Sequence, residues 1–303
     1  MSFMRLAFLA GALVLQSQAV SADGPPPYLK KDLQDLESML VGQWDNDRQI
    51  FFLADSGADP ARVTPRQHLN VERAASDELE QAASLTLSGE TGKNMVITYQ
   101  ITAGSGFIRQ AFSQSPDAGA TCEVLWQRTG TGFSGRSADT SCADLFPAPP
   151  GGQPADFDFS LSDKEFWVTS SRGEATSEIR FRRARTFSCW AAVLKGARHG
   201  DTGEGLDDWE FLPNVSLHDQ GGEAVLQTEE VPPRTIRLKL RDVEWPYGTR
   251  RPSLTLYVYD NDSDRAASYA WTEGGANRIG VNLRWIQASC TYQDAASLKS
   301  LTE

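Results

Sequence analysis

The feature that most constrains this chain is a change of hydrophobic period just after residue 40. Before that point, Leu33, Leu36, Met39 and Leu40 recur at the spacing of one helix face, which predicts an amphipathic helix over residues 29–40. After it, apolar and polar residues alternate in short runs that are separated by clusters of Gly, Asp, Ser and Pro. Such alternation is typical of strands with one buried face, so the sequence predicts an all-β chain with one leading helix.

The first half of the chain contains enough short strands for a closed sheet. Strands are expected at residues 49–53, 67–72, 94–101, 107–112, 122–128, 132–136 and 165–170, and the pattern already begins near residue 157. Closure into an antiparallel barrel would remove the exposed edges of such a sheet. The last barrel strand is expected where Arg180, Arg182, Arg183 and Arg185 gather. These arginines form either a basic rim that holds an anionic ligand or a solvated strand face.

The strand pattern restarts at residue 187. Strands are expected at residues 187–193, 209–211, 215–218, 235–241, 253–259, 267–271 and 279–290. They make a second β unit, which we expect to be a sandwich or a small barrel. The expected organisation is a signal peptide at residues 1–22, a barrel at 29–186, a second all-β domain at 187–293 and a polar tail at 294–303.

Four cysteines bear on both halves of the chain: Cys122, Cys142, Cys189 and Cys290. An even count in an exported chain indicates two disulfides, for which three pairings are open. The pattern favours Cys122–Cys142 across a hairpin and Cys189–Cys290 between the ends of the second domain. Zinc sites built from cysteine need closely paired spacing, which is missing here, so we expect no metal.

The N-terminal residues have the pattern of a secretory signal peptide. A basic start at Arg5 is followed by the apolar residues 6–15 and by small residues that allow cleavage after Ala22. The apolar run is too short to span a bilayer, so we expect a periplasmic or extracellular protein without a membrane span. A formal net charge of −11 argues against a nucleic-acid partner.

Two motifs carry the signal about function. The first has a glycine, an aromatic residue and two spaced amides, and consists of Gly42, Trp44, Asn46 and Gln49. The second is a pair of alternating strands with a cysteine each, and contains Cys122, Trp126, Phe133, Gly135 and Cys142. In this order they resemble the CpcT/CpeT family of chromophore lyases, which bind linear tetrapyrroles (bilins) and help to attach them to cysteines of phycobiliproteins. The resemblance covers about half of the chain.

The resemblance implies a calycin-like barrel with the pigment in it or at its mouth. It implies a set of ligand-binding residues: Trp44, Asn46, Gln49, His68, Arg109, Trp126 and Phe133. For a flat conjugated ligand with two propionates, aromatic rings supply stacking area and an arginine pairs with a carboxylate. The amides would meet pyrrole nitrogens or lactam oxygens. The resemblance assigns no catalytic residue, and it implies no cofactor beyond the bound bilin.

Each of these residues also has a structural interpretation. Trp44 in a Gly-x-Trp segment can plug the closed end of a lipocalin-like barrel, and Asn46 and Gln49 can bond to barrel backbone. Trp126 on an alternating strand fits a core position. Arg109 can pair with Trp44 or a carboxylate as a lock at the barrel end. Ligand transfer through a thiol of this protein needs a thiolate, which a Cys122–Cys142 disulfide would not supply.

Two functions of different classes are therefore open. The first is a bilin lyase or chaperone, which binds a linear tetrapyrrole and passes it to a cysteine of an acceptor protein. The second is a non-catalytic, exported, lipocalin-like carrier of a small hydrophobic molecule, or an envelope interaction protein. His68, His199 and His218 lie far apart in sequence and form no recognisable catalytic motif.

Overall fold

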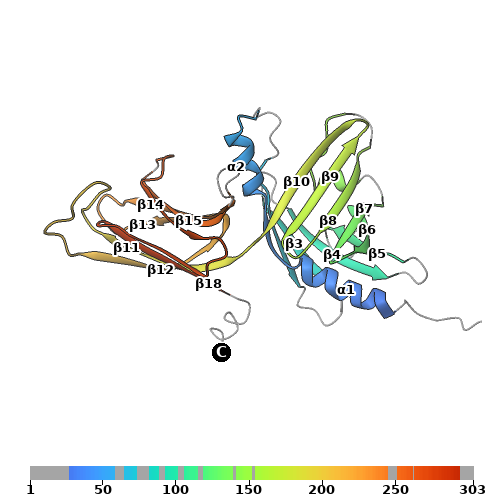
Figure 1. The fold of residues 1–303 in the computed structure, drawn as a ribbon, viewed down its shortest axis with the longest axis horizontal. Helices are drawn as coiled ribbons and strands as arrows, with labels where there is room; N and C mark the ends of the chain where they lie inside the picture. Colours follow the sequence, from blue (N-terminus) through green and yellow to red (C-terminus); the bar gives the residue numbers. More distant parts are fainter. Residues whose placement is uncertain are drawn as a thin grey trace, which may run out of the picture.

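Two β units joined end to end make up the described part of the chain (Figure 1). The structure is a computed structural model, and it describes residues 27–58, 65–73, 82–88, 93–101, 106–114, 119–138, 141–151, 154–244, 251–261 and 263–293. The expected signal peptide and C-terminal tail lie outside these residues. Neither of the helices in the described ranges is long and apolar enough to cross a membrane.

The leading helix α1 spans Pro27–Leu40, as the period of its apolar residues predicts. Four leucines on one face (Leu29, Leu33, Leu36 and Leu40) are buried in the hydrophobic cluster of the barrel. A guanidinium fastens the polar side of the helix, since Arg128 of the barrel wall donates to both Asp32 and Asp35. The helix therefore closes part of the barrel core instead of standing apart from it.

The first unit is a closed antiparallel barrel. Its strands are β1 (Gly42–Asp45), β2 (His68–Arg73), β3 (Ala82–Ser88), β4 (Lys93–Ile101), β5 (Ile108–Ser113), β6 (Cys122–Thr129), β7 (Gly132–Ser137), β8 (Asp156–Leu161), β9 (Glu165–Arg172) and β10 (Ala175–Ala184). Each strand pairs with its neighbours, and the short β1 closes the ring because it pairs with both β2 and β10. The expected barrel is confirmed.

One expected barrel strand is wrong: residues 49–53 belong to helix α2 (Asp47–Asp55). The strand ends because the Asp45 carboxylate accepts the Asp47 N–H at 2.7 Å, which turns the chain at once after β1. Residues 50–53 are a short, wholly apolar run, and such a run does not distinguish a helix from a strand by its period. Strand β3 was not expected, because its sequence is rich in small residues that give little strand signal.

The second unit is a sandwich of two four-stranded sheets that share one hydrophobic cluster. Its strands are β11 (Thr186–Leu194), β12 (Trp209–His218), β13 (Gln220–Gln227), β14 (Thr235–Glu244), β15 (Pro252–Asp260), β16 (Ser268–Glu273), β17 (Arg278–Asn282) and β18 (Ile286–Tyr292). The sheet orders are β12-β11-β18-β17 and β13-β14-β15-β16. The division at residues 186 and 187 into separately folding domains stays a prediction, which expression of each part alone would test.

Three details of the second unit differ from the expectation. The two short segments at 209–211 and 215–218 form the single strand β12, and the long segment at 279–290 folds as the β17–β18 hairpin. The hairpin turns where the Leu283 N–H bonds to the Ile286 carbonyl at 2.8 Å. Strand β13 was not expected, because it opens on Gln220-Gly-Gly222 and glycine weakens the strand signal.

Both expected disulfides are present, and they brace the two units separately. Cys189 and Cys290 are direct cross-strand partners on β11 and β18, 101 residues apart in sequence. Cys122 of β6 is bonded to Cys142, 20 residues later. Cys142 lies in a 3-10 turn at Ser141–Asp144 instead of the expected hairpin strand, so this bond ties a loop to the barrel wall.

Candidate functional site

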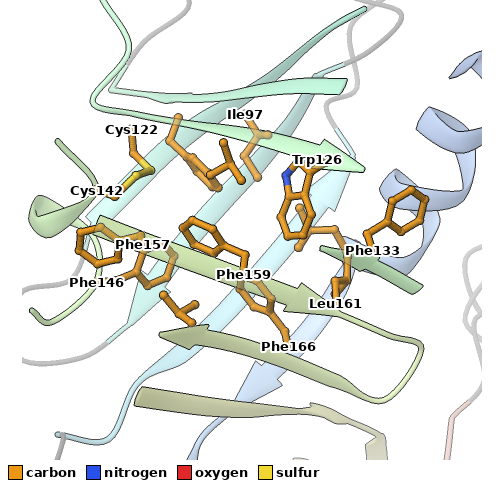
Figure 2. Packing of buried hydrophobic residues seen from close by; sticks show 14 of the residues in the cluster. Ile97, Cys122, Trp126, Phe133, Cys142, Phe146, Phe157, Phe159, Leu161 and Phe166 are labelled. Atoms are coloured by element: carbon orange, nitrogen blue, oxygen red, sulfur yellow. A yellow bond between two sulfur atoms is a disulfide. The ribbon is translucent and has the colours of Figure 1, made fainter. Parts of the chain in front are cut away.

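Aromatic side chains make up much of the buried cluster inside the barrel, among the residues whose side chains are described (Figure 2). Phe159 and Phe166 stack with ring centroids 6.3 Å apart, and Phe166 stacks in turn on Phe181 at 5.8 Å. The edge of the Phe146 ring meets both Phe159 and Phe166. The part of the wall whose side chains are described therefore encloses a packed aromatic core, which an internal pigment would have to displace.

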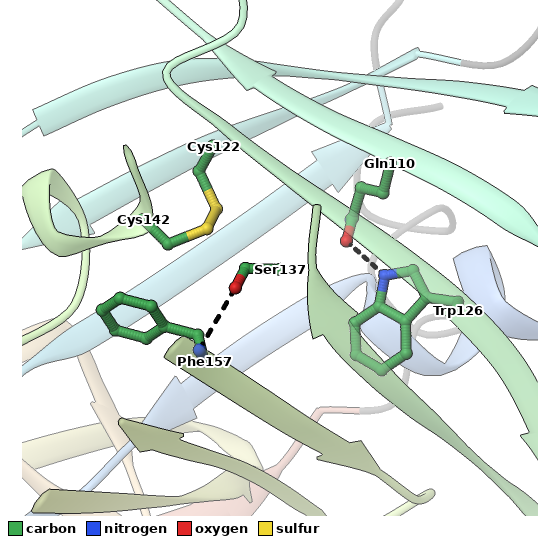
Figure 3. Close-up of a disulfide and its surroundings, with 6 residues drawn as sticks. All are labelled: Gln110, Cys122, Trp126, Ser137, Cys142 and Phe157. Carbon is green, nitrogen blue, oxygen red and sulfur yellow. Dashed lines mark hydrogen bonds between the residues drawn. A yellow bond between two sulfur atoms is a disulfide. The ribbon is translucent and has the colours of Figure 1, made fainter. Parts of the chain in front are cut away.

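The second sequence motif builds this core (Figure 3). Trp126 is fully buried, and its indole Nε1 donates to Oε1 of Gln110 at 2.7 Å. Gly135 is its partner across the β6–β7 pair, and a Cβ added there would lie 2.8 Å from Cε3 of Trp126 and 2.8 Å from Cγ1 of Val124. Glycine is thus required so that the indole can lie against β7. Trp126 takes the core position of the structural interpretation.

Phe133 is also buried, and Arg128 covers its ring with the guanidinium carbon 4.7 Å from the centroid. Since Arg128 also binds two carboxylates of α1, Phe133 belongs to the contact between helix and barrel. The ligand-binding roles predicted for Trp126 and Phe133 stay predictions.

The first motif locks one end of the barrel. Trp44 is fully buried and donates from Nε1 to the Leu40 carbonyl at 2.8 Å. The Arg183 guanidinium lies 4.3 Å from the Trp44 ring centroid and donates to the carbonyls of Met39 and Val41. Gly42 has a φ of +134°, and a Cβ there would lie 2.6 Å from Nη1 of Arg183. Glycine therefore leaves the space that this cation occupies over the tryptophan.

The arginine of this lock is therefore Arg183 and not Arg109. Arg109 pairs with Glu123 of the neighbouring strand, with 2.5 Å between Nη1 and Oε2. Its neighbour Ile108 is buried, so alternation along β5 directs Arg109 to the outer face. Of the two partners that the structural interpretation left open for Arg109, Trp44 or a carboxylate, the structure has the carboxylate, and the ligand-binding role of Arg109 stays a prediction.

The two amides of the motif bond to backbone. Asn46 donates to the Pro65 carbonyl at 3.2 Å and accepts the Gln67 N–H at 2.7 Å, which holds the chain as it enters β2. Gln49 donates to the Glu178 carbonyl at 2.8 Å and accepts the Arg180 N–H at 2.9 Å. Gln49 thereby fastens α2 against β10, and this contact forms one side of a groove.

The α2 groove, as we call it, lies on the outside of the barrel between α2 and strands β9 and β10, with a cavity volume of about 550 Å³. The helix contributes Arg48, Gln49, Phe52, Leu53 and Ser56. The strands contribute Glu165, Trp167, Glu178, Arg180 and Arg182. Three guanidinium groups against two carboxylates give the groove a net positive formal charge, in a chain whose net charge is −11.

Cations and aromatic rings are paired in the α2 groove. The Arg180 guanidinium lies over Trp167, 4.6 Å from the ring centroid, and its Nε donates to Glu178 at 2.6 Å. Arg48 lies 5.8 Å from the centroid of Phe52. These contacts place flat apolar surface directly beside positive charge. The groove is therefore suited to a flat molecule that carries carboxylates.

The sequence predicts part of this groove. Gln49 is one of the predicted ligand residues, and Arg180 and Arg182 belong to the predicted basic rim. Trp167 and Phe52 were missed. Trp167 alternates with the buried Phe166 and Val168, so an outward tryptophan on a strand is the signal that could have identified it. Phe52 was assigned to a strand, and in a strand it would not lie beside Arg48; in the helix the two residues are four positions apart and share one face.

A second polar cluster lies at the junction of barrel and sandwich. Asp45 is 1% exposed, and its carboxylate accepts from Arg66 Nε at 3.2 Å and from Arg66 Nη2 at 3.2 Å. Nδ1 of His68 lies 3.2 Å from Asp45 Oδ2, and Nε2 of His218 lies 4.0 Å from the same atom. The two imidazoles stack with centroids 4.8 Å apart. We call Asp45, His68 and His218 the junction cluster.

The charges of the junction cluster follow from burial and from neighbouring cations. Burial raises the pKa of Asp45, but the hydrogen bond with His68 and the positive charge of Arg66 outweigh it, so the net pKa is lowered. Burial lowers the pKa of His218 to about 4, although the nearby Asp45 carboxylate opposes this effect. His218 is therefore neutral at neutral pH, and Asp45 is charged.

Ion pairs complete the junction. Arg241 of the sandwich binds Asp47 through two bonds of 2.8 and 3.0 Å, and Arg185 binds Asp219 at 2.6 Å. Gly221 has a φ of +76°, and a Cβ there would overlap the Asp47 carboxylate at 2.3 Å. Asp45 and Asp47, which lie between the residues of the first motif, thus join the two units. Sequence reasoning missed the pairing of His68 with His218, since no spacing connects residues on different units.

No protein-family model matches this sequence, and no curated protein matches it either. A solved structure is similar over part of the chain, the T-type phycobiliprotein lyase CpeT from Prochlorococcus phage P-HM1. The two share 16% sequence identity at a TM-score of 0.33, and the match covers 50% of this chain and 96% of the phage protein. The function of the site therefore has to follow from this chain's own side chains.

Proposed function

We propose that this protein is a non-catalytic binding protein for a flat, anionic small molecule, which it holds in the α2 groove. The observation that carries the proposal is the combination of Arg48, Arg180 and Arg182 with Trp167 and Phe52 in one groove. Its volume of about 550 Å³ falls in the range of small-molecule sites. Guanidinium groups bind carboxylates through paired hydrogen bonds, and the rings supply stacking surface.

A linear tetrapyrrole is the specific candidate. Its conjugated chain offers a flat face to Trp167, and its two propionates match a groove with three guanidinium groups. The packed interior favours a site on the outer wall, because an internal pigment would have to displace rings such as Phe159 and Phe166. The motif resemblance to bilin lyases supports the same ligand class.

The ligand is held without a covalent bond to this protein. All four cysteines of the chain are in disulfides, so no thiol is available as a carrier. Transfer of the ligand to a cysteine of an acceptor protein, which the motif resemblance implies, stays a prediction without an assigned residue.

We also propose that the protein is exported, as the N-terminal pattern predicts. Two disulfides support this proposal, because such bonds persist in oxidising compartments and are rare in the cytosol. Expression of the full chain, followed by cell fractionation and N-terminal sequencing, tests it. A mature protein that begins at Asp23 outside the cytoplasm is expected, and an uncleaved cytoplasmic chain contradicts export.

The binding test is a titration of the mature protein with biliverdin, followed by visible absorption. Biliverdin dimethyl ester is the matched ligand, since it keeps the conjugated chain and lacks the charged carboxylates. Arg180→Ala and Trp167→Ala alter the groove, and Arg109→Ala is the control because its ion pair lies on a different part of the outer wall. Circular dichroism confirms that each variant is folded.

We expect saturable binding of biliverdin at micromolar concentration. The dimethyl ester should bind at least ~10-fold more weakly, because it cannot form a charged pair with a groove arginine and the loss of one such pair costs about this factor in affinity. Both groove variants should weaken binding by a similar factor, and Arg109→Ala should leave it unchanged. Equal binding of acid and ester, or weakening only in Arg109→Ala, would contradict a site in the groove. An absence of binding at tens of micromolar would remove the tetrapyrrole as ligand.

A further inference from the structure

Two histidines and one carboxylate from three strands meet at the junction of the two units. Asp45 ends β1, His68 begins β2 and His218 ends β12. Nδ1 of His68 and Nε2 of His218 lie 3.2 and 4.0 Å from the same oxygen, Oδ2 of Asp45. One ligand atom from each residue lies within 4.8 Å of the other two. Three atoms that can act as metal ligands therefore lie close together.

The separations suit a transition-metal ion after a small movement. Zinc bonds of ~2.0–2.2 Å place tetrahedral ligands ~3.3–3.5 Å apart. The 3.2 Å between His68 Nδ1 and Asp45 Oδ2 is already close to this spacing, and His218 Nε2, at 4.0 Å, has to approach Oδ2 by roughly 0.5–0.7 Å to reach it. No hydrogen bond among the described residues opposes this movement, since Nδ1 of His218 is buried without such a partner and Nε2 is beyond bonding distance of Asp45.

The surroundings resemble those of a ligand set. Arg66 donates to both oxygens of Asp45 and also to the Gly221 carbonyl at 2.8 Å, so the carboxylate has a fixed orientation. Carboxylate ligands of metals are commonly held by such outer hydrogen bonds. The side chains of His68 and His218 are 24% and 19% exposed, which leaves an opening for an ion and for water as a further ligand.

We propose that Asp45, His68 and His218 form a binding site for a divalent first-row transition-metal ion, with Zn²⁺ as the expected ion. Two imidazoles and one carboxylate with an open position are a ligand set typical of zinc and of non-haem iron. Because Asp45 and His68 belong to the barrel and His218 to the sandwich, the ion connects the two units. The site is separate from the α2 groove and does not depend on the function proposed for it.

Neither the cysteine spacing nor the sequence separation of the histidines predicts this site. The pairing of His68 with His218 arises from the topology of the fold, which brings the end of β12 beside the start of β2. The chain has three histidines in all, and the third, His199, is exposed and contacts Trp285 elsewhere in the sandwich. His199 is thus a built-in control for nonspecific metal binding by imidazole.

The test uses the untagged mature protein, freed of metal with a chelator. Binding of Zn²⁺ is measured by calorimetry and binding of Co²⁺ by its visible absorption, in the wild type and in His68→Gln, His218→Gln and His199→Gln. We expect one ion per chain. We expect a loss of affinity of more than ~100-fold in the first two variants, because even outer partners of metal ligands change affinity 10–100-fold. His199→Gln should bind like the wild type.

A measurement on the wild type covers the case in which a variant fails to fold. In a histidine-labelled sample, Co²⁺ should shift or broaden the imidazole NMR signals of two of the three histidines and leave the third unchanged. The proposal is overturned if the wild type binds no ion at 100-micromolar concentration, if binding survives in both junction variants, or if His199 is the histidine that responds.

Discussion

Replacement of Gly135 by alanine should destabilise the protein more than the loss of any surface contact. The new Cβ would lie 2.8 Å from both Trp126 and Val124, whereas ordinary contacts are longer than 3.4 Å, so buried side chains have to move. Overpacking of this kind costs ~1–3 kcal/mol of unfolding free energy. If the indole moves away from Gln110, the buried amide loses its donor, which adds ~1–3 kcal/mol.

The matched control is Gly119→Ala, because a Cβ at Gly119 meets no atom within 4 Å and the backbone there is not in the left-handed region. Urea denaturation followed by tryptophan fluorescence gives the unfolding free energy of both variants. We expect Gly135→Ala to lose at least ~1 kcal/mol relative to Gly119→Ala. Equal stability of the two variants would refute the packed core, since it would mean that the space beside Trp126 is open.

Three further predictions concern stability and are checked by the same denaturation measurement. Arg183→Ala should cost ~2–4 kcal/mol of unfolding free energy, because Trp44 loses its cation and the partly buried carbonyls of Met39 and Val41 lose their donor. Arg109→Ala removes a partly exposed pair and should cost under ~1 kcal/mol, so similar costs would contradict the lock. Removal of the Cys189–Cys290 disulfide should lower the free energy of unfolding by ~4–5 kcal/mol and removal of Cys122–Cys142 by ~3 kcal/mol, because the first closes the longer loop. The opposite order would count against the entropy of the unfolded chain as the cause. In metal-free protein, burial lowers the pKa of His218 to about 4 in the folded chain, whereas the unfolded chain takes up this proton near the ordinary pKa of 6.5. The free energy of unfolding should therefore fall by ~2–3 kcal/mol between pH 7 and pH 4.5. His218→Gln should remove this part of the pH dependence, and an unchanged pH dependence would refute the burial of a neutral imidazole.

The fold could be predicted from the sequence because the chain repeats one local signal. Alternation identified most strands of both units, and the cysteine pattern gave both disulfides. The signal failed at α2, where the wholly apolar run from Ile50 to Leu53 has no period to read. It also failed at β3 and β13, whose small residues and glycines carry little strand preference.

The candidate site could be predicted only in part, since its function depends on which face each side chain occupies. Trp44 and Trp126 each had a ligand-binding and a structural interpretation, and the structure places Trp44 in the barrel lock and Trp126 in the core. Arg180 and Arg183 stand three residues apart, yet one lines the α2 groove and the other covers Trp44. The junction of His68 with His218 arises only when two units pack together, and no local pattern encodes it.

A crystal structure of the mature protein soaked with biliverdin would locate the ligand directly. If the α2 groove is the binding site, ligand density should lie between α2 and strands β9 and β10, with carboxylates at Arg180 or Arg182 and a ring against Trp167, while Phe159 and Phe166 keep their stacked positions. Density inside the barrel, with these phenylalanines displaced, would contradict a site in the groove.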